Sequence, residues 1–99
     1  MFGLITKFKT APGRRDALIA ILTAGTSGMP GCLSYIVAKD TAEADAVWIT
    51  EVWSTRESHQ ASLSLPAVQQ AIAKGRPLIA GFSARFETEP VGAHGLIAG

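Results

Sequence analysis

The sequence has 99 residues, of which 47% are apolar, and a formal net charge of +1. This length suits a single domain with a modest core, which association with a partner would help to stabilise. The nine Lys and Arg residues are scattered along the chain, which argues against a nucleic-acid-binding surface. The single cysteine, Cys32, excludes an intrachain disulfide and fits a reducing compartment.

Export and membrane insertion are not indicated. The N-terminus lacks a basic segment followed by an apolar run. No stretch approaches the roughly 20 apolar residues that a membrane helix needs. We therefore expect a cytoplasmic protein that binds neither membranes nor nucleic acids.

The N-terminal half predicts a strand, a helix and a second strand. Residues 2–9 alternate between two faces, as a strand does. Pro12 has the φ angle of a first helical turn and apolar residues then recur at helical spacing, so a helix is expected over residues 12–23. A turn rich in glycine and proline precedes a strand over residues 32–39.

The C-terminal half predicts the same order again. Residues 46–53 are aromatic and β-branched, as in a strand. Ser54 and Glu57 then fit a capping box, which predicts a helix over residues 55–63.

A further short helix is expected to open at Pro66 and to end at Gly75 in a left-handed conformation. Residues 82–89 alternate as a last strand, with Phe82 and Phe86 on the same face.

This β-α-β-β-α-β order predicts an α+β fold, a ferredoxin-like split β-α-β with a four-stranded antiparallel sheet. The helices can cover only one face of such a sheet. Val47 and Trp53 nevertheless lie on one face of the third strand, and Trp48 and Val52 on the other. Large apolar groups on both faces need two covers, so we expect a homodimer in which a second copy packs on the open face.

The domain is expected to span residues 1–90. Residues 91–99 form a small, glycine-rich C-terminal tail that would normally fray unless something holds it.

Four motifs now suggest a family. The segment TEVWS at residues 50–54 precedes the capped helix and the run ASLSLPAV at residues 61–68. Together with APGR at residues 11–14 and MPGC at residues 29–32, their order resembles the antibiotic biosynthesis monooxygenase (ABM) family, including its quinol monooxygenase-like members. The resemblance extends to about residue 89.

This resemblance implies a ferredoxin-like domain that dimerises through its sheet into a dimeric α+β barrel. It also implies oxidation of a small phenolic or quinol substrate by O2, with no metal, flavin or other cofactor. The implied partners are a small aromatic molecule and a second copy of the chain.

The sequence departs from the family at one candidate base. Many relatives carry a histidine nine residues after the tryptophan that ends the third strand, where this chain has Ser62. Here a histidine instead stands six residues after Trp53, at His59.

The haem-degrading branch of the family is not expected. It uses an asparagine on the first strand and a tryptophan and a histidine in the helical segment. This chain carries Thr6 and Lys7 on the first strand and Ala61 and Ala71 at the matching helical positions.

A phenol must lose a proton before it passes an electron to O2, and histidine is the usual base near neutral pH. His59 lies one helical turn before Leu63, so both side chains can point towards the sheet. We therefore predict His59 as the catalytic base and Leu63 as part of the substrate pocket. The competing interpretation is a half-exposed surface histidine.

Four strand residues are predicted to complete the substrate pocket. Trp53 could stack on a substrate or be part of the core, and Phe8 would lie beside it. Tyr35 could donate to a substrate oxygen or reach solvent. Glu51 shares the face of Trp53 and must be paired there, for which an ion pair with Arg85 is the favoured account.

No metal site is expected, because His59, His94 and Cys32 lack ligand spacing. The sequence also lacks a phosphate-loop or dinucleotide fingerprint. Arg76 is expected to be a solvated charge.

Three functions stay open. The first is a cofactor-independent monooxygenase, with His59 as base and Trp53 and Tyr35 as walls. The second is a non-catalytic small aromatic ligand-binding or sensing dimer. The third is a structural dimer whose cavity is filled by its own side chains.

Overall fold

A computed structural model describes residues 1–96 of the chain. The strands and helices follow one another in the predicted order. The elements are β1 (Phe2–Thr10), α1 (Arg15–Gly25), β2 (Cys32–Lys39), β3 (Ala46–Trp53), α2 (Arg56–Ser62), α3 (Pro66–Gly75), the 3₁₀-helix η1 (Arg76–Leu78) and β4 (Ile79–Thr88).

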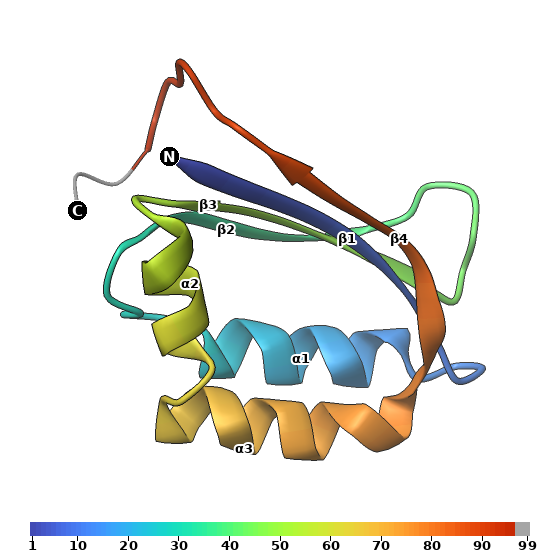
Figure 1. Cartoon of the computed structure of the whole chain (residues 1–99). Coiled ribbons are helices and arrows are strands. Elements are labelled where there is room, and N and C mark those ends of the chain that lie inside the picture. Colours follow the sequence, from blue (N-terminus) through green and yellow to red (C-terminus); the bar gives the residue numbers. More distant parts are fainter. Residues whose placement is uncertain (97–99) are drawn as a thin grey trace.

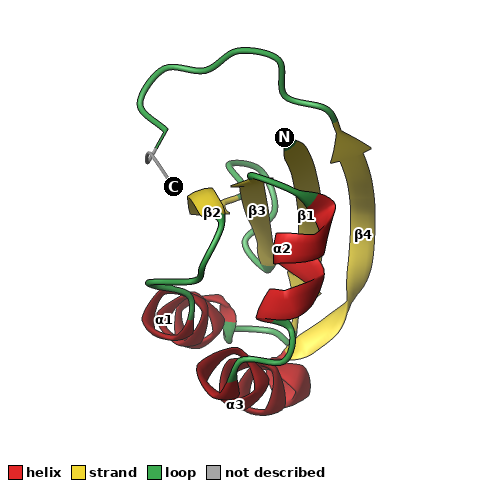
Figure 2. Ribbon diagram, turned by 60° about the vertical axis from the view of Figure 1, so that its left-hand side comes forward, coloured by secondary structure: helices red, strands yellow, loops and turns green. Residues whose placement is uncertain are grey.

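The four strands form one antiparallel sheet in the order β2-β3-β1-β4. All helices lie on the same side of this sheet, with α1 and α3 side by side and α2 nearer the end of β3 (Figures 1 and 2). The predicted ferredoxin-like α+β fold is therefore confirmed. No helix of residues 1–96 is long and apolar enough to cross a membrane.

The first helix begins three residues later than predicted. Gly13 has a φ of +73°, and the amide of Arg14 donates to the carbonyl oxygen of Ala11 over 3.0 Å. These two features close a turn over residues 11–14, so Pro12 belongs to the turn and helical dihedrals start only at Arg15.

The cap of α2 also lies one residue later than predicted. The Oγ1 atom of Thr55, not that of Ser54, accepts from the amide of Ser58 over 3.0 Å. Ser54 stays with the sheet because its own amide donates to the carbonyl oxygen of Gly31 over 2.8 Å.

Gly75 is not a left-handed stop. Its φ is −78°, and the chain continues directly into η1. A Cβ atom at Gly75 would lie 3.2 Å from Cδ1 of Leu18, so the glycine allows α3 to approach α1 closely.

Phe82 and Phe86 lie on opposite faces of β4, contrary to the prediction. The β1–β4 register shifts between Lys7 and Phe8, so that Phe8 pairs with Phe82 while Ile5 pairs with Phe86. This bulge interrupts the alternation of side chains and turns Phe82 towards the helices.

The core lies between the sheet and the helices, where Leu18, Val47 and Trp53 are fully buried. Within residues 1–96, no helix covers the opposite face of the sheet (Figure 2). Ile36 and Phe86 there keep 55% and 56% of their surface exposed. Trp48 lies on the same face, and its Nε1 atom donates to Asp40 over 2.8 Å.

After Thr88 the chain leaves the sheet. Of the predicted tail, residues 91–96 are described, carry no helix or strand and follow a path over the end of the sheet (Figure 1). Residues 97–99 lie outside the described residues.

Replacing Leu18 with alanine should destabilise the fold by about 2–5 kcal/mol, because a fully buried leucine is removed where close helix packing prevents collapse. Urea denaturation followed by circular dichroism measures this loss. Val91→Ala is the control, since Val91 is 92% exposed and its truncation should change stability by less than about 0.5 kcal/mol. Equal effects of the two substitutions would contradict the packing described above.

Candidate functional site

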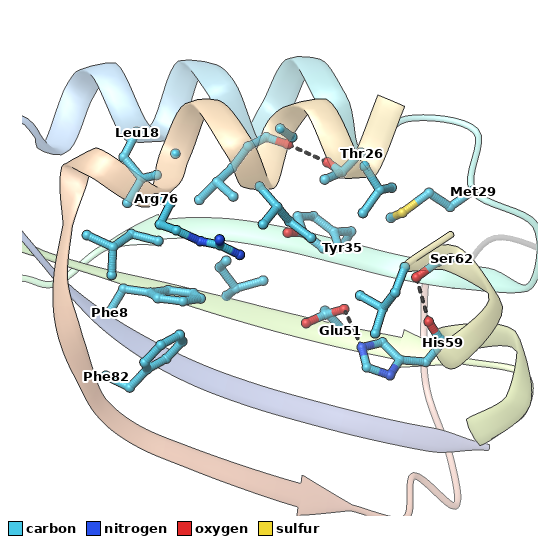
Figure 3. Close-up of a pocket in the computed structure, with 18 of the residues that line it drawn as sticks. Phe8, Leu18, Thr26, Met29, Tyr35, Glu51, His59, Ser62, Arg76 and Phe82 are labelled. Carbon is cyan, nitrogen blue, oxygen red and sulfur yellow. Dashed lines mark hydrogen bonds and ion pairs between the residues drawn. The ribbon is translucent and has the colours of Figure 1, made fainter. Parts of the chain in front are cut away.

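A cavity of about 580 Å³ lies between the covered face of the sheet and the three α-helices. Its volume falls within the range of small-molecule sites. Its wall is mostly apolar, and Figure 3 shows Glu51 and His59 on one side of it, Arg76 on the other and Tyr35 between them. The lining residues that the argument below uses are Phe8, Leu18, Met29, Tyr35, Glu51, Trp53, His59, Ser62, Leu63, Arg76 and Phe82.

All six residues predicted from the sequence line this one cavity. The sheet register explains why the strand residues meet, since Glu51 pairs with Leu4 on one side and with Tyr35 on the other. Directly paired residues point to the same face, so Tyr35 and Glu51 both face the helices. Leu63 lies at the rim, where about half of its surface is exposed.

His59 and Glu51 form the polar end of the cavity. Nε2 of His59 lies 4.0 Å from Oε1 of Glu51, and the two side chains are only 14% and 11% exposed (Figure 3). The imidazole packs between two rings, with centroids 5.4 Å from Trp53 and 5.5 Å from Phe2. His59 is therefore an inward-facing side chain and not a surface histidine.

Trp53 supplies the hydrogen bond that Glu51 needs. Nε1 of Trp53 donates to Oε1 of Glu51 over 3.0 Å. The pair follows from strand geometry, because residues two apart share a face. The favoured ion pair between Glu51 and Arg85 is not formed among the described residues. Arg85 acts on Glu51 only as a nearby positive charge.

Burial moves the pKa values of these two groups in opposite directions. It raises the pKa of Glu51, although the Trp53 hydrogen bond and the charge of Arg85 oppose the shift. Burial lowers the pKa of His59, helped by the positive charges of Arg85 and Arg56 and opposed by Glu87. The imidazole is therefore neutral near pH 7 and can accept a proton.

Tyr35 contributes a hydrogen-bond donor. Burial, together with the negative charges of Glu51 and Cys32, raises the pKa of its phenol well above the usual range. The hydroxyl thus stays protonated and can donate to an oxygen of a bound molecule.

Some lining residues were not predicted. Phe82 was missed because the bulge in β4 leaves no clear sequence signal, and its ring centroid lies 4.9 Å from that of Phe8. Arg76 is exposed, as expected, and it also lines the cavity from η1 (Figure 3). Ser62 also lines the cavity, where its hydroxyl donates to the carbonyl oxygen of His59 over 2.6 Å.

Metal-binding groups are not gathered here. Within residues 1–96, no three His, Cys, Asp or Glu side chains lie together as ligands.

The fold is thus a helix-covered antiparallel sheet, and the candidate site is a mostly apolar cavity with an inward-facing histidine. A sequence profile of the antibiotic biosynthesis monooxygenase family matches residues 1–74, so the chain belongs to this family. No curated protein matches the sequence significantly.

Solved structures agree with this assignment. A Chloroflexus aurantiacus J-10-fl protein, provisionally named an antibiotic biosynthesis monooxygenase, is 64% identical, with a TM-score of 0.94 over 96% of this chain and 97% of that one. Proteins with the same provisional name from Caulobacter crescentus CB15 and Deinococcus radiodurans are 17% and 24% identical, with TM-scores of 0.82 and 0.77. They cover 92% and 99% of this chain and 90% and 100% of their own, and they support the fold alone.

The pKa of His59 should lie below 6.5, because protonation places a charge in an apolar wall beside positive groups. NMR titration of the imidazole nitrogens measures it, and a His59→Gln variant assigns the resonance. Less than half of His59 should be protonated at pH 6.5. A midpoint at or above 6.5 would show that the imidazole is solvated or paired more strongly than the geometry indicates.

Proposed function

We propose that the cavity is the active site of a cofactor-independent monooxygenase that oxidises a small phenolic or quinol-type substrate with O2. The observation that carries the proposal is an inward-facing histidine, whose side chain is 14% exposed, beside a carboxylate at the end of a mostly apolar cavity of about 580 Å³. Membership of the family supports oxygenation as the reaction. The single cysteine favours a cytoplasmic location.

The first step is removal of the ring hydroxyl proton by His59. The imidazolium that forms is stabilised by Glu51, 4.0 Å away, in a site that excludes most water. Tyr35 donates to a substrate oxygen and holds the ring in place. A positioned base of this kind contributes roughly 10²–10⁴-fold to the rate.

Oxygen transfer then needs no external reductant. The phenolate passes one electron to O2, and the resulting substrate radical and superoxide combine into a ring peroxide that takes the proton back from His59. Loss of the ring C–H proton breaks the O–O bond and leaves a carbonyl. The departing hydroxide and that proton form water, so a naphthol and O2 yield a naphthoquinone and one water.

The aromatic walls assist by binding a flat ring. Phe8 and Phe82 lie beside each other on β1 and β4, with ring planes tilted by 51°, while Trp53 closes the polar end. At the polar end the fully buried Trp53 keeps water from the radical pair, which would otherwise separate.

O2 uptake with a panel of hydroquinones and naphthols, corrected for autoxidation, tests this reaction. The metal-stripped wild-type protein should consume O2 and form quinone, and His59→Ala should lower the rate by roughly a hundredfold or more. His94→Ala is the matched control, because His94 lies exposed in the tail and outside the cavity.

Unchanged uptake in His59→Ala would remove His59 from the mechanism. No uptake above autoxidation by the wild-type protein would favour the second candidate, a non-catalytic aromatic ligand-binding or sensing dimer. Ser62 favours that candidate, because its hydroxyl is engaged with the carbonyl oxygen of His59 and supplies no second base.

We also propose that two copies associate through the open face of the sheet. Ile36, Trp48 and Phe86 lie on this face, and burying them would stabilise a small domain. Phe86→Asp should therefore shift the protein from twice the chain mass towards a monomer in sedimentation equilibrium.

Leu63→Asp is the control for this substitution, because Leu63 is also about half exposed but lies on the helical side. It should leave the dimer intact. A wild-type monomer, or equal dissociation of both variants, would contradict association through this face.

A further inference from the structure

Among the described residues that line the cavity, Arg76 is the only arginine or lysine. The proposed reaction does not use it. Arg76 is exposed and reaches towards the middle of the cavity from η1, on the side where Phe8 and Phe82 lie, whereas Glu51 and His59 lie on the opposite side (Figure 3). Among residues 1–96, no carboxylate forms an ion pair with Arg76 and no group hydrogen-bonds its guanidinium.

The sheet sets the separation between the two ends of the cavity. Glu51 is level with Leu4 of β1, and Phe82 is level with Phe8, four residues further along the same strand. At about 3.4 Å per residue, these levels are roughly 14 Å apart. Arg76 lies at the far level, because Ile79 at the start of β4 pairs with Thr10 just beyond Phe8.

The charge distribution of the cavity is therefore asymmetric. A carboxylate and a neutral histidine stand at the buried end and a guanidinium at the open end, with mostly apolar side chains and Tyr35 between them (Figure 3). A guanidinium binds a carboxylate through two parallel hydrogen bonds, whereas the carboxylate of Glu51 repels an anion. A molecule with one anionic group has only one favourable orientation here.

We propose that Arg76 binds an anionic group of the substrate, so that the substrate is a hydroxylated aromatic acid with its carboxylate and its reacting hydroxyl at opposite ends of the ring system. Arg76 then acts as a specificity and positioning residue. It holds the acid at the open end and delivers the hydroxyl to His59. This inference rests on the proposed function for the identity of the reacting group, and the binding of the anion can be tested apart from it.

Anaerobic binding tests the inference without catalysis. The probes are a hydroxynaphthoate and the matching hydroxynaphthamide, with substituents at opposite ends of the ring system, measured by calorimetry. Wild-type protein should prefer the acid by about tenfold, the scale of one charge-assisted hydrogen-bonded pair. Arg76→Gln should abolish this preference, and Arg76→Lys should restore part of it. The preference should also weaken as salt is raised.

Lys74→Gln is the matched control. It also removes one positive charge, and Lys74 lies two residues before Arg76 but does not line the cavity. It should keep the preference for the acid. If Lys74→Gln and Arg76→Gln lost the preference for the acid equally, the preference would come from the overall positive charge of the protein and not from Arg76. This result would overturn the inference.

O2 uptake with the same two probes separates this inference from the proposed function. If neither variant nor wild type prefers the acid, but the amide is still oxidised, the anion site is wrong and the oxygenase stands. If the acid is bound through Arg76 but never oxidised, the anion site stands and the oxygenase is wrong.

Discussion

The hydrogen bond from the Trp53 indole to the Glu51 carboxylate joins the core of this domain to its candidate site. Trp53 is fully buried, so its N–H group needs an acceptor inside the protein, and Glu51 is the acceptor that the strand places on the same face. The carboxylate is thereby held in an apolar wall, where burial raises its pKa. His59 packs edge-on against the same indole, which brings its Nε2 atom to 4.0 Å from Glu51. Core packing and candidate chemistry thus depend on one side chain.

The cavity exists because the helices pack closely on each other and less closely on the sheet. A Cβ atom at Gly25 would lie 2.7 Å from Cβ of Ala71, and one at Gly75 would lie 3.2 Å from Cδ1 of Leu18. At these two glycines, the backbone of one helix therefore packs directly against a side chain of the other. The long strands extend beyond this contact, and the space between them and the helices stays open. In the proposed reaction this space holds a flat aromatic ring, with the base at the buried end and an anion-binding arginine at the other.

Most of the correct predictions about the site came from the periodicity of the strands. The period of two places Phe8, Tyr35, Glu51 and Trp53 on one face, and the i, i+4 spacing of His59 and Leu63 places both on the cavity side of α2, so the predicted side chains do meet. Predictions from local sequence signals were wrong where tertiary contacts determine the backbone conformation. Gly75 ends α3 as predicted but is not left-handed, and the chain continues into η1, which brings Arg76 to the cavity. The bulge that turns Phe82 inward has no sequence signature, because it depends on pairing with β1.

The most direct test of the central claim, that the helix-covered cavity is the ligand site, uses the two indole N–H resonances as opposite probes. Trp53 donates to Glu51 in the cavity wall, whereas Trp48 donates to Asp40 on the other face of the sheet. Adding a naphthol anaerobically to ¹⁵N-labelled protein should shift the Trp53 indole resonance and leave that of Trp48 in place. A shift confined to Trp48, or no shift of either resonance at saturating naphthol, would contradict the account.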